Sequence, residues 1–197
     1  MGLEKFLRET KPIRARSLSL GVRSIGEEDA LLIYTAAYTY ASSRHSGLMA
    51  LDAGAGIGYS TLWLAKALED AGCSGCRVVG IEHSPARCRE ASRIASTARF
   101  EGVELEFVEG DALSYVKGLD RETVDIAFVD VEKPLYPDML RLLESRLKPG
   151  GIALFHNAYF PPPPRGFASL ASQKPWRSTM IPTATGGLLL AIRMPDS

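Results

Sequence analysis

Short apolar runs and helix-like segments alternate along most of the chain. A first helix is expected to begin near Glu27, because Ser24-Ile25-Gly26-Glu27 has the form of a capping box and no helix breaker follows. Beyond it, apolar stretches of strand length recur, separated by segments of helical character. The expected strands are 48–51, 77–82, 103–108, 124–129 and 151–155, and the expected helices between them are 61–70, 85–99, 112–117 and 136–147.

This alternation predicts the fold class. Strands that alternate with helices form parallel sheets covered on both faces, and right-handed crossovers make the arrangement doubly wound. The candidates 178–181 and 188–192 have no helix between them and should pair as an antiparallel hairpin. We therefore expect an α/β fold with a mostly parallel, seven-stranded sheet, in which five parallel strands are followed by the C-terminal hairpin. Residues 159–175, with four consecutive prolines, are expected to be a loop.

Length and charge add simple limits. The 197 residues suit a single domain, residues 1–197, in which a basic N-terminal arm of residues 1–23 precedes a core of residues 24–197. Lys and Arg together equal Asp and Glu at 23 each, which does not favour a surface that coats a polyanion. Because no apolar run has the roughly 20 residues of a membrane span and the N-terminus lacks a signal-peptide pattern, a cytoplasmic protein is expected.

Two of the three cysteines, Cys73 and Cys76, have C-x-x-C spacing. Structural zinc needs four nitrogen or sulfur ligands, and neither a second C-x-x-C pair nor an H-x3-H pair follows. The pair is therefore interpreted as small residues in a turn or as a disulfide, with a redox pair or half of a zinc site as the alternative.

Three glycines at alternate positions, Gly54, Gly56 and Gly58, follow the first apolar run and precede a helix-like segment. In an open parallel sheet, ligands bind at the carboxyl ends of the strands, and the first strand-to-helix turn lines the binding crevice. Glycine lets the backbone turn sharply and approach a ligand, with amide hydrogens exposed at the start of the next helix. The sequence therefore predicts a cofactor-binding turn at these residues.

The charge beside this turn separates two classes of cofactor. Nicotinamide dinucleotides are bound by G-x-G-x-x-G, whereas the spacing here is G-x-G-x-G. Asp52 would repel a pyrophosphate and attract the ammonium and sulfonium charges of S-adenosylmethionine, which favours the methyl donor. Glu82, at the end of the second expected strand, can accept the ribose hydroxyls of either cofactor. Asp111 is interpreted either as a helix N-cap or as an adenine contact.

The motifs Leu51–Ala65, Val108–Ala112 and Phe128–Lys133 resemble the class I S-adenosylmethionine-dependent methyltransferases. Within that class, the sequence looks most like the catechol and caffeoyl-CoA O-methyltransferase group, over residues 24–194. The resemblance implies a Rossmann-like core and, in some members, a homodimer. The residues expected to bind the cofactor are Asp52, Gly54, Gly56, Gly58, Tyr59, Ser60, Glu82, His83, Asp111, Ala112 and Asp130.

The same resemblance implies a transfer site. In that group a divalent cation, often magnesium, is held by an Asp after the fourth strand and an Asp-Asn pair after the fifth, and a nearby Lys serves as base. Asp130 and Lys133 match the first acid and the Lys. His156-Asn157 stands where the pattern has Asp-Asn, so this chain departs from the family at one ligand. The expected catalytic residues are Lys133, Asp130 and His156.

The departure leaves three interpretations of His156 open. Magnesium prefers oxygen ligands, so its affinity should be lower here, whereas imidazole suits zinc, iron, copper or nickel. A softer metal held by Asp130, His156 and Asn157 is one interpretation. A metal-free site with His156 as general base is the second, and a structural histidine at a strand end is the third. Lys133 is either the implied base or a surface cation.

The expected function is S-adenosylmethionine-dependent O-methyl transfer to a small hydroxylated acceptor, phenolic or catechol-like. One alternative is an RNA methyltransferase on the same fold, because residues 1–23 are basic. The other is a cofactor-binding protein that has lost the metal-dependent chemistry. The expected partners are a small-molecule acceptor and a second copy of the chain, without a membrane. The residues that make the arm basic are Lys5, Arg8, Lys11, Arg14, Arg16 and Arg23.

Overall fold

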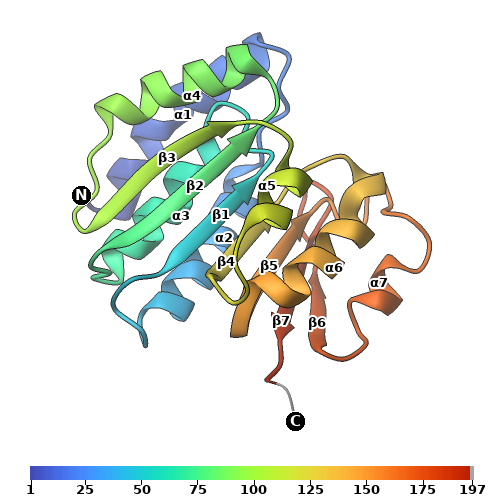
Figure 1. The fold of residues 1–197 in the computed structure, drawn as a ribbon. Coiled ribbons are helices and arrows are strands. Elements are labelled where there is room, and N and C mark those ends of the chain that lie inside the picture. The colour runs from blue at the N-terminus through green and yellow to red at the C-terminus, as the bar shows by residue number, and fades with distance from the viewer. Residues whose placement is uncertain (196–197) are drawn as a thin grey trace.

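The structure, a computed structural model, describes residues 1–195 and contains one seven-stranded sheet in the order β3-β2-β1-β4-β5-β7-β6 (Figure 1). The five strands from β3 to β5 are parallel, and β7 runs antiparallel to both β5 and β6. The expected fold class is therefore confirmed. The strands are β1 Met49–Ala53, β2 Cys76–Glu82, β3 Val103–Glu109, β4 Val124–Val129, β5 Leu147–His156, β6 Trp176–Ile181 and β7 Leu188–Arg193.

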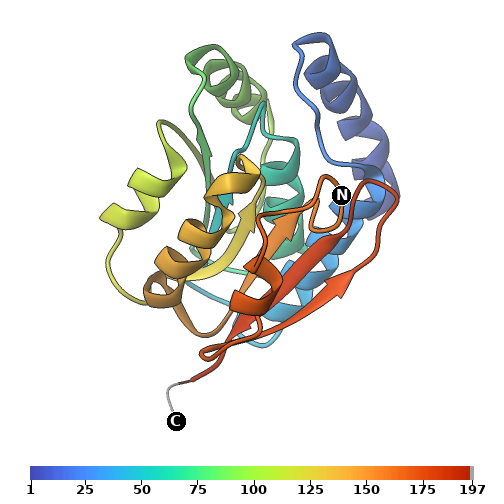
Figure 2. The same ribbon diagram turned by 90° about the vertical axis from the view of Figure 1, so that its right-hand side faces the viewer.

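Helices cover both faces of the sheet (Figures 1 and 2). One core cluster joins α1, α2 and α3 to one face, and a second joins α5, α6 and α7 to the other. No helix within residues 1–195 is both long and apolar enough to cross a membrane. The helices are α1 Leu3–Ser19, α2 Glu27–Ala41, α3 Tyr59–Asp70, α4 Pro85–Thr97, α5 Ala112–Gly118, the 3-10 helix η1 Lys133–Leu135, α6 Tyr136–Arg146 and α7 Phe167–Leu170.

The strand order reverses at β1, which pairs with β2 on one side and β4 on the other. The first crossovers lead from β1 to β2 and β3, and the chain then returns to place β4 on the opposite side of β1. The loops at the carboxyl ends of β1 and β4 diverge at such a point and leave a crevice between them. The topology thus locates the site before any side chain is considered.

The N-terminal residues, which we expected to form a basic arm, are packed into the fold. Residues 3–19 form α1, and its Phe6 is 3% exposed. The Phe6 ring meets the Trp63 ring of α3 edge-on, with 5.0 Å between centroids. Charge alone suggests an arm, but the apolar positions between the charges give this segment a face to bury.

Two further segments add detail to the predicted fold. The proline-rich connection after β5 contains α7, whose Phe167 is buried against the rings of Tyr136 and Phe155. Cys73 and Cys76 form a disulfide in the turn between α3 and β2, so the disulfide interpretation of the C-x-x-C pair is the one found. Cys88 is buried and unpaired.

Candidate active site

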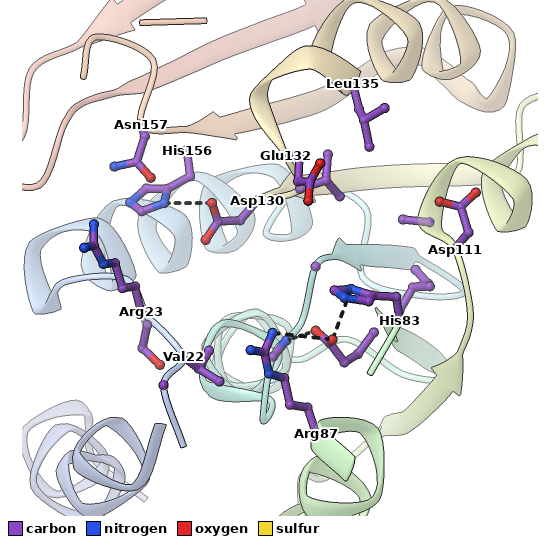
Figure 3. A pocket seen from close by; sticks show the side chains of 18 of the residues that line it. Val22, Arg23, His83, Arg87, Asp111, Asp130, Glu132, Leu135, His156 and Asn157 are labelled. Atoms are coloured by element: carbon purple, nitrogen blue, oxygen red, sulfur yellow. Dashed lines mark hydrogen bonds and ion pairs between the residues drawn. The ribbon is translucent and has the colours of Figure 1, made fainter. Parts of the chain in front are cut away.

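A cleft of about 1340 Å³ opens at the carboxyl ends of the parallel strands (Figure 3). Its volume exceeds the roughly 300 to 1,000 Å³ of a pocket for one drug-sized ligand, so two ligands can be held side by side. One half is formed by the turn after β1 and the ends of β2 and β3, and the other half by the ends of β4 and β5. The α1–α2 connection and the proline-rich loop also border the cleft, and Val22 of the former lies beside Gly56.

The glycine turn, residues 54–58, forms one wall. Its three glycines have positive φ angles, 94° at Gly54, 58° at Gly56 and 92° at Gly58. A Cβ atom at Gly54 would lie 2.5 Å from the carbonyl oxygen of Asp130, and one at Gly58 would lie 2.7 Å from the Phe107 ring. The protein's own backbone and core therefore exclude side chains at these two positions. Only Gly54 and Gly56 line the cleft.

Asp52 lies beneath this turn and is fully buried. The hydroxyls of Ser60 and Thr61 each donate to its Oδ2 at 2.6 Å, while its Oδ1 has no hydrogen-bond partner among the described residues. Burial raises the pKa of Asp52 to about 6, although the two hydroxyl hydrogen bonds oppose the rise. Asp52 does not line the cleft, so its effect on a bound cation acts from behind the turn.

Tyr59 and Ser60, expected at the cofactor, also lie behind this wall. Both are buried in the first turn of α3, and neither lines the cleft. The Tyr59 ring packs against Trp63 with 6.3 Å between centroids, and Ser60 is engaged with Asp52. Their position supports the shape of the glycine turn.

Glu82 ends β2 and faces the cleft with a side chain that is 3% exposed. Its Oε2 accepts the backbone N–H of Gly56 at 2.9 Å, and its Oε1 accepts that of Ser84 at 2.9 Å. The carboxylate thus fixes the glycine turn while each oxygen keeps a lone pair for another donor. His83 and Arg87 lie 3.4 and 3.9 Å from its Oε1 (Figure 3).

Asp111 and Ala112 line the cleft beyond Glu82. Asp111 caps α5, because its Oδ2 accepts the Ser114 N–H at 2.7 Å, and this hydrogen bond lowers its pKa. The cap and the place in the cleft coexist, so the two interpretations of Asp111 do not exclude each other.

His156 lines the second half of the cleft. Its ring, 6% exposed, lies between two carboxylates that come from other elements. Nδ1 is 3.1 Å from Asp130 Oδ1, and Nε2 is 3.2 Å from Asp29 Oδ2. The Nδ1 contact is an ion pair without the alignment of a hydrogen bond. Burial alone would lower the His156 pKa, but Asp130 and Asp29 raise it from 6.5 to about 9, so the ring is protonated at neutral pH.

Asp29 contacts His156 at this site and was not among the residues expected from sequence patterns. It is fully buried at the start of α2 and accepts the backbone N–H of Gly26 at 3.1 Å. Burial would raise its pKa, yet the hydrogen bonds from His156 and Thr185 lower it to about 2. A capping pattern two residues later than the one we expected, with Gly26 as cap, would have identified Asp29 as the capping acid, but nothing local connects it to His156.

Lys133 has a different environment from the one implied by the resemblance. Its ammonium donates to the Tyr136 hydroxyl at 2.7 Å and to the His156 carbonyl oxygen at 2.9 Å. Burial lowers its pKa. Lys133 does not line the cleft, whereas Asp130, His156 and Asn157 do. The ammonium therefore ties η1 to the end of β5.

The donor set at the end of β4 and β5 does not fit a divalent cation. Both ring nitrogens of His156 face carboxylates, so neither offers a lone pair to a metal. Asn157, with a positive φ of 51°, donates its side-chain amide to the Thr185 carbonyl oxygen at 2.6 Å. Among residues 1–195, no group of three or more His, Cys, Asp and Glu side chains is arranged to hold a metal ion. The soft-metal interpretation thus has no geometric support.

Comparison with known proteins gives the same picture of the core. Residues 51–158 match the family described as a methyltransferase domain. A protein of Mycobacterium avium (strain 104), assigned by its name as an O-methyltransferase, is 27% identical over 167 residues, which cover 76% of this chain and 73% of that protein.

Solved structures share the fold. A methyltransferase from Geobacter sulfurreducens has a TM-score of 0.74 at 23% identity, over 94% of this chain and 89% of that one. The O-methyltransferase from Bacillus cereus, solved with SAH, has a TM-score of 0.72 at 21% identity, over 98% of this chain and 92% of that one. Since the family match spans more than half of the sequence, this chain belongs to the methyltransferase domain family and has the fold of class I S-adenosylmethionine-dependent methyltransferases.

Proposed function

We propose that this chain transfers the methyl group of S-adenosylmethionine to a hydroxyl oxygen of a small phenolic or catechol-like acceptor. The observation that carries the proposal is a single cleft with two chemically different halves. One half has the glycine turn and Glu82, and the other has Asp130 beside His156. The family membership and the O-methyltransferase relative support the reaction class.

The first half fits the methyl donor. Glu82 holds the turn and keeps acceptor capacity toward ribose hydroxyls, and Asp111 and Ala112 line the cleft beyond it, where the adenine would lie. The unpartnered, buried Oδ1 of Asp52 favours a positive charge above the turn. S-adenosylmethionine supplies a methyl group on a positively charged sulfur, which is already activated for displacement.

The second half fits an aromatic ring that carries a hydroxyl. Phe160, which is 75% exposed, borders the cleft from the proline-rich loop, and Leu18 borders it from the end of α1. The flat Phe160 ring suits a phenolic ring, with the polar end directed toward Asp130 and His156. Arg23 borders the same space, with its guanidinium directed toward His156 and Asn157 (Figure 3).

Asp130 and His156 would have different roles toward the acceptor hydroxyl. The Asp130 side chain is 21% exposed, so its carboxylate can accept the hydroxyl hydrogen bond and the proton. The positively charged His156 ring beside it stabilises the negative charge that develops on the acceptor oxygen. In this proposal Lys133 fixes the backbone that carries His156 and does not act as base.

Two measurements test the function. Calorimetry should detect binding of S-adenosylmethionine and S-adenosylhomocysteine to the full chain. Transfer of labelled methyl groups should then be followed with phenolic, catecholic and acyl-CoA acceptors and with bulk RNA. If the folded protein binds neither S-adenosylmethionine nor S-adenosylhomocysteine, the methyltransferase assignment is refuted. Label that enters RNA but no small phenol refutes the acceptor class.

A further inference from the structure

Asp29, His156 and Asp130 form a row across three elements. Asp29 comes from the first turn of α2, His156 from the last position of β5, and Asp130 from the loop after β4. The ring contacts Asp29 through Nε2 and Asp130 through Nδ1, at 3.2 and 3.1 Å. Asp29 is fully buried, whereas Asp130 reaches the cleft. The row therefore has a closed end at Asp29, away from the cleft, and an open end at Asp130, in the cleft.

The closed end is rigid. Asp29 Oδ2 accepts the Gly26 backbone N–H and the hydroxyl of Thr185 in the β6–β7 connection, besides facing His156. These donors come from a helix cap and from a hairpin, so two elements hold the carboxylate beside the ring. Lys133 holds the backbone of the same histidine through its carbonyl oxygen. The ring orientation is thus fixed from the side away from the cleft.

The open end directs Nδ1 at the acceptor half. The Nδ1 atom is buried and has no aligned hydrogen-bond partner among residues 1–195, although Asp130 Oδ1 lies within ion-pair distance. A group that displaces Asp130 Oδ1 from this contact can receive a hydrogen bond from Nδ1, which no aligned partner occupies. Two cations come from neighbouring elements: Arg23 borders the same cleft, and Lys133 donates its ammonium to the backbone carbonyl oxygen of His156 instead of facing the cleft.

We propose that Asp29 is a positioning residue of the transfer site, holding His156 so that its Nδ1–H meets the acceptor oxygen beside Asp130, and that this carboxylate–imidazole pair replaces a divalent cation. The part that concerns the acceptor oxygen rests on the proposed function. The part that concerns the cation does not, because it follows from the donor set alone. Methyl transfer by this chain accordingly needs no added metal.

The chemical step balances without a metal. The acceptor hydroxyl gives its proton to the Asp130 carboxylate, and its oxygen forms a bond to the methyl carbon. The carbon–sulfur bond breaks as that bond forms, and its electron pair stays on sulfur, which becomes a neutral thioether. Asp130 then loses the proton to water. The Nδ1–H of His156 donates to the acceptor oxygen while negative charge develops there.

The cation part is tested on the folded chain with S-adenosylhomocysteine, by calorimetry and by thermal unfolding with Mg²⁺, Mn²⁺ or Zn²⁺. We expect no binding and no shift of the melting temperature in the native chain. His156→Asp should gain Mg²⁺- and Mn²⁺-dependent stabilisation, because it removes the positive ring and leaves three carboxylates facing one another. Saturable Mg²⁺ or Mn²⁺ binding to the native chain that Asp130→Asn abolishes overturns the proposal.

The positioning part is tested with Asp29→Asn and the matched control Glu28→Gln. Glu28 is the neighbouring residue, accepts the Ala184 backbone N–H at 2.8 Å, and so ties the same hairpin to α2 without touching His156. We expect Asp29→Asn to lower kcat at least tenfold while the affinity for S-adenosylhomocysteine stays within twofold. Glu28→Gln should change neither by more than twofold. Equal losses of kcat in both variants, or an unchanged kcat in Asp29→Asn, overturn the positioning role.

The two levels of failure are distinguishable. If the chain binds neither cofactor form, the proposed function fails. If it binds S-adenosylhomocysteine and methylates a phenol only when Mg²⁺ or Mn²⁺ is added, the proposed function stands and this inference fails.

Discussion

Replacing Asp29 with asparagine should lower the pKa of His156 and change how stability depends on pH. Burial lowers the pKa of His156, but the charges of Asp130 and Asp29 and the hydrogen bond with Asp29 raise it from 6.5 to about 9. Asp29→Asn removes one of the two negative charges and keeps a side-chain oxygen for the Gly26 N–H. The variant therefore tests the charge while it retains the helix cap.

The magnitude follows from the shift. A histidine whose pKa is higher in the folded than in the unfolded chain stabilises the fold fully below pH 6.5, and this stability is lost as pH rises through about 9. At about 1.4 kcal/mol per pKa unit, the shift corresponds to about 3 kcal/mol, and solvent screening reduces it little because the side chain is 6% exposed. We expect Asp29→Asn to cost about 1 to 2 kcal/mol near pH 6 and much less near pH 10.

Two assays measure these quantities. The imidazole ring proton signals of the three histidines are followed by NMR across pH, with His156→Gln identifying the relevant signal. Urea unfolding at both pH values gives the free energies of unfolding. The reasoning is refuted if His156 in the native protein titrates at or below its ordinary pKa. It is refuted equally if Asp29→Asn destabilises the protein by the same amount at both pH values.

Three other outcomes are expected. Gly54→Ala should lower the free energy of unfolding by about 2 kcal/mol or more, since the added Cβ would lie 2.5 Å from the Asp130 carbonyl oxygen at a φ of 94°. Gly110→Ala is the control, because a Cβ there meets nothing within 4 Å. Equal stability of the two variants would contradict this prediction. Glu82→Gln should weaken S-adenosylhomocysteine binding about tenfold in calorimetry, and an unchanged Kd would remove Glu82 from the ribose site. Lys133→Met should lower the free energy of unfolding, measured in urea, by about 1 kcal/mol and leave the affinity for S-adenosylhomocysteine unchanged. Loss of methyl transfer in a variant of native stability would instead support Lys133 as the base.

Local sequence patterns determined most of the secondary structure. The strand expected at 124–129 has the bounds of β4, and the other expected strands overlap those observed. Apolar runs of strand length between helical segments depend on neighbours in sequence, so they can be interpreted without coordinates. The terminal hairpin was predictable for the same reason, since two strands without a helix between them must run antiparallel. The short α7 was not, because its four residues follow prolines that favour a loop.

The sequence also brought much of the site to one edge. Gly54, Gly56, Glu82, Asp130 and His156 all follow or end parallel strands, and all line the cleft. Parallel strands share one carboxyl edge, so residues at their ends meet whatever the details of packing. The sequence predicted glycines that let the backbone approach a ligand. In the structure, atoms of the protein itself exclude a side chain at Gly54 and Gly58, so the reason for glycine was only partly predictable.

Tertiary structure alone decided the surroundings of the residues in the proposed transfer site. Asp29 and His156 are 127 residues apart in sequence, and their contact needs α2 to pack beside the end of β5. That contact adds a second carboxylate beside the imidazole and helps to raise its pKa, while Lys133 donates to the Tyr136 hydroxyl and does not line the cleft. The sequence by itself determined which elements form and which strand ends meet, because both follow from local periodicity and sheet topology. The charge state of His156 and the direction of Lys133 depend on partners that packing brings together, so only the folded protein determines them.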